Sequence, residues 1–283
     1  MTVRQRRRRR AAAVGDATRG VLYAALRFAA TLVTSLHAAL GLVIIVFALV
    51  AFAGVWGFVE VAQAVGAGGA LQRFDNAIMV WIAEHRMPLL EAFLIESTVL
   101  GSWVVIAIVI GTAAVFLETA QRRWSVILLF ASSAGGIVIT QMLKFGFDRE
   151  RPQLFEWADH VVTSSFPSGH AASAAIAYGT IAYLAARLHR HAVTRWAILI
   201  IAAVMILLVA VSRLYLGVHH PSDVIAGLLI GTAWAAFCMA ALEATQRYAR
   251  RREPNLAEAA APGRRESAPP EGPGYRDHPL RSG

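Results

Sequence analysis

The sequence predicts an all-α fold, a bundle of six transmembrane helices with an interfacial helix after the first span. Of the 283 residues, 57% are hydrophobic and only 16% are charged, and the mean hydropathy is +0.53. Soluble domains carry more charge than this, whereas a helix that crosses a bilayer needs about 20 mainly apolar residues. Windows of that length recur at 38–59, 99–117, 124–143, 170–187, 196–212 and 223–243.

The stretch between the first two expected spans, 60–98, is less apolar than the spans themselves. Its apolar residues, among them Phe74, Ile78 and Trp81, recur at helical spacing, with Asp75 on another face. This pattern predicts a helix that lies on the membrane surface. It serves either as a connector or as an element through which substrate enters.

The fourth expected span, 170–187, is rich in alanine and contains Ser173 and Thr180. Small and weakly polar residues are typical of a helix packed among other helices, because they let backbones approach closely. We therefore expect this span to pack among other helices rather than to face lipid all round.

The charged residues predict the orientation of the chain. We expect a basic segment at 1–36, a six-span domain at 37–246 and a disordered tail at 247–283, which is rich in Pro, Gly, Glu, Arg and Ser without periodicity. Both ends and the connectors after the second and fourth spans are basic, so the positive-inside rule places both termini in the cytoplasm. The sequence thus predicts a multi-pass protein of the cell membrane.

Composition also argues against other classes of protein. The net charge is +9, but the basic residues lie at the two ends and in short connectors, so no soluble basic module for nucleic acid is indicated. Arg6–Arg10 is too far from the first apolar stretch for a cleavable signal peptide. The single cysteine, Cys238, lies in an apolar span and is expected to be a small buried residue.

Lys144 is the only lysine of the chain and lies where the third expected span ends. Arg149, Arg151 and Pro152 follow it within one short loop. A lysine acts as a point charge and an arginine as a two-pronged donor, a combination that suits phosphate oxygens. Basic residues at a helix end also contact lipid headgroups, so this segment alone leaves both interpretations open.

The segment Pro167–His170 predicts the start of the fourth span. Ser168 can cap a helix and Gly169 allows close approach of the backbone, and free amides at a helix N-terminus attract anions. His170 falls in the first turn, where an imidazole with an ordinary pKa of about 6.5 can give or take a proton. A capped helix with an interfacial histidine is the alternative.

A third segment begins with Ser212 and Arg213 at the end of the fifth span and continues to Asp223. If Ser222 caps the sixth span, Asp223 can accept a hydrogen bond from one nitrogen of His219 and leave the other nitrogen facing outward. A charged residue this close to the membrane is a functional candidate. A purely structural ion pair is the alternative.

His219 and His220 together with Asp223 also raise the possibility of a metal site. Neighbouring residues in an extended segment point in opposite directions, however, and no further cluster has the spacing of metal ligands. The sequence therefore predicts neither a metal nor another cofactor. All three segments fall on the non-cytoplasmic side by charge bias alone, which predicts that they form one site.

Taken together, the three segments resemble the type 2 phosphatidic acid phosphatase (PAP2) family, which shares its site with certain bacterial acid phosphatases and vanadium haloperoxidases. The family pattern is Lys-x6-Arg-Pro, then Pro-Ser-Gly-His, then Ser-Arg-x5-His-x3-Asp. Every residue of this pattern is present here. The resemblance covers roughly residues 74–243, and its three motifs together are highly specific.

The resemblance implies a role for each matching residue. His219 is similar to the nucleophile that forms a phosphohistidine, and Asp223 to the residue that orients it. His170 is similar to the general acid, which would protonate the leaving group and then activate water. No metal is implied, and vanadate should inhibit. The residues that would hold the phosphate oxygens are Lys144, Arg151, Ser168, Gly169 and Arg213.

The function that follows is hydrolysis of a lipid phosphate or diphosphate, such as phosphatidate, phosphatidylglycerophosphate or a polyprenyl diphosphate. The same residues could instead pass the phosphoryl group to a lipid or sugar hydroxyl, which would make the protein a phosphotransferase. A non-enzymatic lipid-binding or transport protein could also retain the fold. Haloperoxidase chemistry conflicts with the hydropathy, because those relatives are soluble. The expected partners are a lipid phosphate substrate and membrane lipid, with no nucleic acid.

Overall fold

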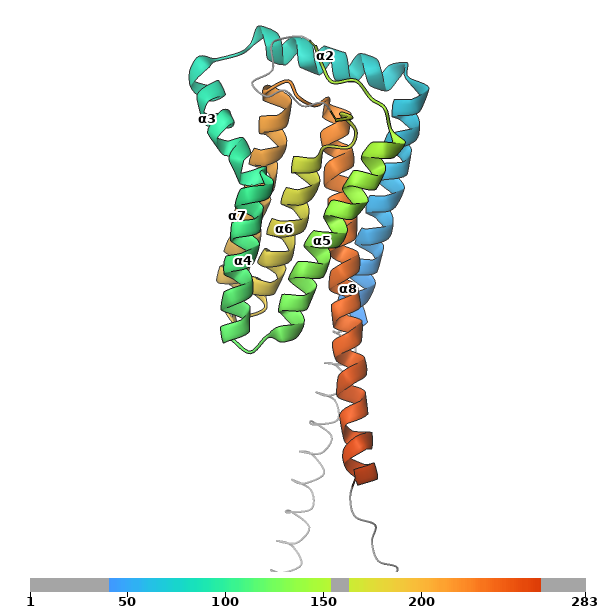
Figure 1. Cartoon of the computed structure of the whole chain (residues 1–283), viewed down its shortest axis with the longest axis vertical. Helices are drawn as coiled ribbons and strands as arrows, with labels where there is room; N and C mark the ends of the chain where they lie inside the picture. Colours follow the sequence, from blue (N-terminus) through green and yellow to red (C-terminus); the bar gives the residue numbers. More distant parts are fainter. Residues whose placement is uncertain (1–40, 154–162, 261–283) are drawn as a thin grey trace, which may run out of the picture. The chain divides into compact units, whose positions relative to one another are not determined.

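Helices account for all the regular structure in residues 41–153 and 163–260, which are the residues described in the computed structural model (Figure 1). The expected basic segment at 1–36 and the part of the expected tail beyond 260 lie outside these residues. The helices, in chain order, are Gly41–Ala67, α2 (Ala70–Glu84), α3 (Pro88–Thr98), the 3-10 turn η1 (Val99–Gly101), α4 (Trp103–Thr119), α5 (Arg123–Gly146), α6 (Gly169–Ala186), α7 (Ala192–Tyr215) and α8 (Pro221–Ala260).

Within the described residues, four helices are long and apolar enough to cross a membrane, and a fifth crossing results if one bent pair is counted as a single span. The bent pair joins Pro88–Gly101 to Trp103–Thr119 at an angle of 53°. We expected one span at 99–117. The chain instead breaks at Ser102, which has an extended backbone and whose hydroxyl accepts a hydrogen bond from the amide of Val105 at 3.3 Å. A serine in this role starts a new helix.

α6 corresponds to the expected fourth span but is not apolar enough to count among these crossings. It packs against α4, α5 and α7, and ten of its 18 residues are buried, most of them alanines. α8 also approaches it closely, since a Cβ atom added to Gly231 would lie 2.6 Å from the carbonyl oxygen of Ala172. Because protein surrounds α6, small residues favour its packing more than large apolar ones would.

α2 lies across one end of the bundle formed by α4 to α7 (Figure 1). Its inner face buries Met79 and Ile82 against Leu94 and Tyr215, while its outer face exposes Phe74, Val80 and Trp81. The expected connector 60–98 is thus divided between the end of Gly41–Ala67, α2 and α3. Only α2 lies across the bundle.

α8 continues past the expected end of the membrane domain at residue 246. The chain divides into two compact units between Ala244 and Thr245, and α8 passes from the first unit into the second as far as Ala260. Residues 247–260, which we expected to be disordered, are therefore helical. Ala, Arg, Glu and Leu, which are good helix formers, make up most of this stretch.

Candidate active site

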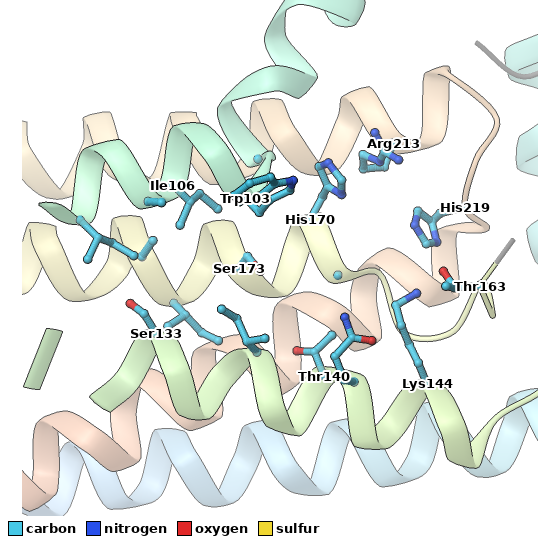
Figure 2. A pocket seen from close by; sticks show the side chains of 18 of the residues that line it. Trp103, Ile106, Ser133, Thr140, Lys144, Thr163, His170, Ser173, Arg213 and His219 are labelled. Carbon is cyan, nitrogen blue, oxygen red and sulfur yellow. The ribbon is translucent and has the colours of Figure 1, made fainter. Parts of the chain in front are cut away.

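The three motif segments contribute to one pocket of about 470 Å³ between α4, α5 and α6 (Figure 2). At one end of the pocket, the end of α5, the start of α6, the end of α7 and the loops that follow α5 and α7 converge. Figure 2 shows Lys144, Arg213 and His219 at this end, with His170 nearer the middle. The basic side chains that line the pocket are Lys144, Arg151, His170, Arg213 and His219.

The pocket extends from the basic end along α5, between facing walls that are mainly apolar. Ser133, Ile137, Thr140, Gln141 and Lys144 line it from α5 at helical spacing. A helix rises 1.5 Å per residue, so Ser133 and Lys144 are separated by about 16 Å along α5. The facing walls are formed by Ile106, Ala107 and Ile110 of α4 and by Ile176 and Ala177 of α6.

Lys144 and Arg151 are both held by main-chain carbonyl groups. Nζ of Lys144 donates to the carbonyl oxygen of Ser164 at 2.7 Å. Nη1 of Arg151 donates to the carbonyl of Val218 at 2.6 Å, and its Nε donates to that of Thr163 at 3.1 Å. The segment before α6 and the loop after α7 therefore fix both cations at the same end of the pocket.

His219 is buried, with only 2% of its surface exposed. The pKa of His219 is lowered from 6.5 to about 4, chiefly by burial and also by the nearby guanidinium groups of Arg151 and Arg213, whereas Asp223 acts in the opposite direction. The imidazole is therefore neutral at pH 7. A neutral imidazole keeps one nitrogen unprotonated, which nucleophilic attack requires.

Asp223 is fully buried behind the histidine. Its Oδ1 accepts a hydrogen bond from Arg149 at 2.5 Å, and its Oδ2 accepts from the amide of His220 at 2.8 Å and from the hydroxyl of Ser165. Nδ1 of His219 lies 3.7 Å from Oδ2, which is too long for the hydrogen bond that we expected. Hydrogen bonds of this kind are often long before substrate binds and then tighten.

The first turn of α8 explains how Asp223 is placed. We expected Ser222 to cap this helix, but the helix begins at Pro221, which is common at the first helical position because proline has no N–H. Asp223 is therefore the third helical residue and reaches back to the amide of His220. This is the reciprocal half of a capping box, formed by an aspartate.

The start of α6 places its motif residues in different surroundings. Gly169 and His170 line the pocket, whereas Ser168 is not among the lining residues and its side chain does not cap the helix as expected. The amide of Ser168 donates to the carbonyl of Asp223 at 2.9 Å. Ser168 thus contributes through its backbone, which ties the start of α6 to the start of α8.

Arg213 is 5% exposed and reaches the pocket from the last turn of α7. Its Nη1 donates to the hydroxyl of Thr98 at 2.8 Å. Thr98 is the last residue of α3, just before the break, so the bent helix pair supports a pocket cation. We did not predict a role for this threonine, because a threonine at the end of a helix carries no distinctive signal.

Arg149 and Asp75 have a role at the site that we did not predict from the sequence. Arg149 does not line the pocket, but it forms ion pairs with both Asp75 and Asp223, at 2.7 Å and 2.5 Å. The signal that could have drawn attention to Asp75 is its place directly after Phe74 in a helix expected at the membrane surface. An acidic residue at such a position is a functional candidate. Across the described part of the chain, no three His, Cys, Asp or Glu side chains converge as a metal-binding group.

The fold and the pocket define a helical membrane protein with a buried cationic site at one end of an apolar pocket. The model of the PAP2 superfamily matches residues 124–247. Phosphatidylglycerophosphatase B of Bacillus subtilis is 34% identical over 168 residues, which cover 57% of this chain and 80% of that protein. The chain therefore belongs to the PAP2 superfamily, and the resemblance of its motifs is confirmed.

Two further comparisons agree with this membership. An undecaprenyl-diphosphatase of Sulfolobus acidocaldarius is 32% identical over 141 residues, which cover 48% of this chain and 64% of that protein. The crystal structure of a transmembrane PAP2-type phosphatidylglycerolphosphate phosphatase from Bacillus subtilis superimposes with a TM-score of 0.62 and 28% identity, over 67% of this chain and 94% of that one. The relatives are thus named as phosphatases of lipid phosphates or diphosphates, which are hydrolases.

Proposed function

We propose that this protein is an integral membrane phosphatase that hydrolyses a lipid phosphate or diphosphate through a phosphohistidine intermediate. The observation that carries the proposal is the pocket itself, in which a cluster of basic side chains continues into an apolar half between α4, α5 and α6. Such a pocket suits a phosphate headgroup attached to an apolar tail. The names of the relatives favour phosphatidylglycerophosphate and polyprenyl diphosphates as substrates, beside phosphatidate.

In this proposal, Lys144, Arg151 and Arg213 hold the phosphate oxygens. The two guanidinium groups donate in pairs and the ammonium acts as a point charge. The amide of Gly169, at the N-terminus of α6, adds a further donor. Ser168 acts through the position of its backbone. These groups would stabilise the charge on the trigonal-bipyramidal transition state.

The first chemical step is attack on phosphorus by the unprotonated nitrogen of His219. The N–P bond forms as the P–O bond to the leaving group breaks, and the leaving oxygen takes the bonding electron pair and a proton from His170. In the second step His170 removes a proton from water, whose oxygen attacks phosphorus while the N–P bond breaks. Inorganic phosphate leaves and neutral His219 is restored. Asp223 orients the imidazole throughout.

We further propose six membrane crossings, with α6 as the crossing that protein surrounds. The positive-inside rule then places Arg122, Arg123 and Arg187 in the cytoplasm. The motif residues, at the other ends of α5 and α6, face the non-cytoplasmic side. α2 would lie at that interface with Phe74 and Trp81 toward lipid, since aromatic residues favour the headgroup region. A substrate could then enter without its tail leaving the bilayer.

The buried acidic side chains in the described part of the chain give little support to the alternative of a transport protein. Glu243 is 4% exposed, but it is paired with Arg187 and accepts a hydrogen bond from the hydroxyl of Tyr183. A buried carboxylate that is paired in this way has a structural explanation. A proton or ion route would instead require acidic groups in succession along the bundle.

The deciding experiment is a phosphate-release assay on the purified protein in detergent with EDTA present. The substrates are phosphatidate, phosphatidylglycerophosphate and undecaprenyl diphosphate, and the variants are His219→Ala and His170→Ala. We expect release from at least one substrate, a loss of about 1,000-fold or more in His219→Ala, and an acid-labile phosphoenzyme in the wild type. Full activity of His219→Ala would refute the proposal. Product formation that requires an added hydroxyl acceptor, with no free phosphate, would identify a phosphotransferase.

A further inference from the structure

We propose that Arg149 and Asp75 are positioning residues, which fix the carboxylate of Asp223 and make turnover at His219 depend on the docking of α2. This inference rests on the proposed function, because it assigns His219 as the nucleophile. It goes beyond the motif residues, since Asp75 lies on α2, outside all three segments.

Arg149 is the centre of the arrangement. Its Nη1 donates to Oδ1 of Asp223 at 2.5 Å and to the hydroxyl of Ser222 at 2.7 Å. Its Nη2 donates to Oδ2 of Asp75 at 2.7 Å and to Oε1 of Gln72 at 2.9 Å. One side of the guanidinium therefore contacts the start of α8, and the other side contacts α2. A planar guanidinium with donors in a fixed fork can bridge two carboxylates in this way.

Asp75 completes the connection. Its side chain is fully buried, with 0% exposed. It accepts hydrogen bonds from the amide of Ser222 at 3.0 Å and from the hydroxyl of Ser222 at 2.5 Å, in addition to the bond from Arg149. A buried carboxylate is tolerated only when it is paired and hydrogen-bonded. Here its partners all belong to the loop after α5 and to the first turn of α8.

These contacts differ from those of the pocket cations. Lys144, Arg151 and Arg213 line the pocket, whereas Arg149 does not. Both terminal nitrogens of Arg149 are directed at carboxylate, hydroxyl and amide oxygens of the protein. Arg149 is therefore placed to hold Asp223 rather than the phosphate.

The consequence for catalysis follows from the two oxygens of Asp223. Arg149 binds Oδ1, while Oδ2 faces Nδ1 of His219 at 3.7 Å and Nδ1 of His220 at 3.4 Å. If Arg149 is lost, the carboxylate is held only through Oδ2, by the amide of His220 and the hydroxyl of Ser165. The carboxylate can then turn about this oxygen, and the imidazole loses part of its orientation. A misplacement of about 1 Å at a reacting group can cost about 100-fold in rate. Substrate binding would change little, because the phosphate ligands are different residues.

The test compares Arg149→Gln, Asp75→Asn and the double variant in the phosphate-release assay, with His219→Ala as the inactive reference. We expect kcat to fall about 100-fold in Arg149→Gln and about tenfold in Asp75→Asn, with KM within about twofold of the wild type. The double variant should be no slower than Arg149→Gln, because residues that act through one another are not additive. Glu91→Gln, which removes the half-exposed ion pair with Arg86, is the matched control and should keep wild-type kcat.

Each result supports or overturns the inference. Each kcat is calculated for the folded fraction of the protein, which thermal unfolding and gel filtration measure. A substitution that only lowers the folded fraction would then leave kcat unchanged. Wild-type kcat in Asp75→Asn or Arg149→Gln would overturn the positioning role, as would losses that multiply in the double variant. A rise in KM with unchanged kcat would make Arg149 a substrate ligand instead. If His219→Ala remained active, the proposed function itself would fail, which separates the two outcomes.

Discussion

Nη1 of Arg151 lies 3.4 Å from Nε2 of His219, while the same nitrogen donates to the carbonyl of Val218 at 2.6 Å. A fixed guanidinium thus lies beside the nitrogen that would attack phosphorus. A phosphate oxygen bound by this guanidinium would be close to the nucleophile before reaction, which is how positioning lowers a barrier. The contact also disfavours protonation of the imidazole.

The burial of His219 predicts a specific dependence of stability on pH. Its pKa is about 4 in the folded protein and about 6.5 in an unfolded chain, so the unfolded state binds an additional proton between these values. Stability should therefore fall as the pH falls from about 6.5 to about 4, and this contribution should vanish above about 6.5. We expect the melting temperature of the wild type to drop more than that of His219→Gln between pH 7.5 and pH 4.5. Parallel curves for the two proteins would contradict the lowered pKa.

The hydrogen bond between Arg213 and Thr98 predicts that Thr98→Val weakens the handling of phosphate. Hydrogen bonds to charged groups contribute about 1.5–3 kcal/mol, so kcat/KM for the lipid phosphate should fall about tenfold or more. The neighbouring hydroxyl of Ser97 donates to the carbonyl of Phe93 within its own helix, and Ser97→Ala should stay within about twofold of the wild type. Equal effects of the two substitutions would argue against a specific role for Thr98.

Gly101 is placed so closely against the site that Gly101→Ala should impair both folding and activity. An added Cβ atom would lie 2.5 Å from Cγ1 of Val209 and 3.1 Å from Cδ2 of His170. Overpacking of this kind costs about 1–3 kcal/mol, and relief would push on His170. We expect a lower melting temperature and about tenfold slower phosphate release.

The matched control for Gly101→Ala is Gly111→Ala on α4, where no heavy atom lies within 4 Å of the added Cβ. Alanine is favoured over glycine within a helix by about 0.5–1 kcal/mol, so this variant should be as stable as the wild type or more stable. Destabilisation by both substitutions would mean that α4 tolerates no change in general, and the assignment of Gly101 to the site would lose its support.

The apolar half of the pocket predicts that Ala107→Trp discriminates between substrates by tail length. Ala107 lines the pocket and is exposed, so a tryptophan can fill the space without disturbing the core. Each methylene that is expelled from contact costs about 0.8 kcal/mol, and kcat/KM for dioleoyl phosphatidate should fall about tenfold relative to the dihexanoyl compound. Ile108→Trp, at an exposed position that does not line the pocket, should leave this ratio unchanged. An unchanged ratio in Ala107→Trp would place the tail elsewhere.

The helices of the second half of the chain could be predicted from sequence because their ends carry strong signals. The expected spans 124–143, 196–212 and 223–243 lie within α5, α7 and α8, and each of these three windows is mainly apolar. The window 170–187 matches α6 in position even though its apolarity is low, because Pro167 and Gly169 mark its start. The break at Ser102 was missed, since Trp103 and the following residues continue the apolar run without interruption.

The site residues were predictable only where one motif contains them. His219 and Asp223 lie four residues apart, so the short turn before α8 is enough to bring Nδ1 of His219 to 3.7 Å from Oδ2 of Asp223. Arg149 and Asp75 are separated by 74 residues, and Arg213 and Thr98 by 115. Such pairs are determined by how α2 and α3 pack on the bundle, which single-residue propensities do not encode. The expectation of Ser222 as a cap was wrong because Pro221 begins α8 and Asp223 accepts from the amide of His220. Ser168 does stand at the N-cap position of α6, but its side chain forms no capping hydrogen bond.

The 53° bend between Pro88–Gly101 and Trp103–Thr119 connects two kinds of selectivity. Just before the bend, Thr98 supports a cation at the polar end of the pocket, and just after it Ile106 and Ile110 form a wall of the apolar end. A tilt of α4 that admitted a bulkier tail would also shift the support of Arg213. In the proposed function, headgroup and tail preferences are therefore mechanically linked, and we expect a change of lipid substrate to be accompanied by substitutions on both sides of this bend.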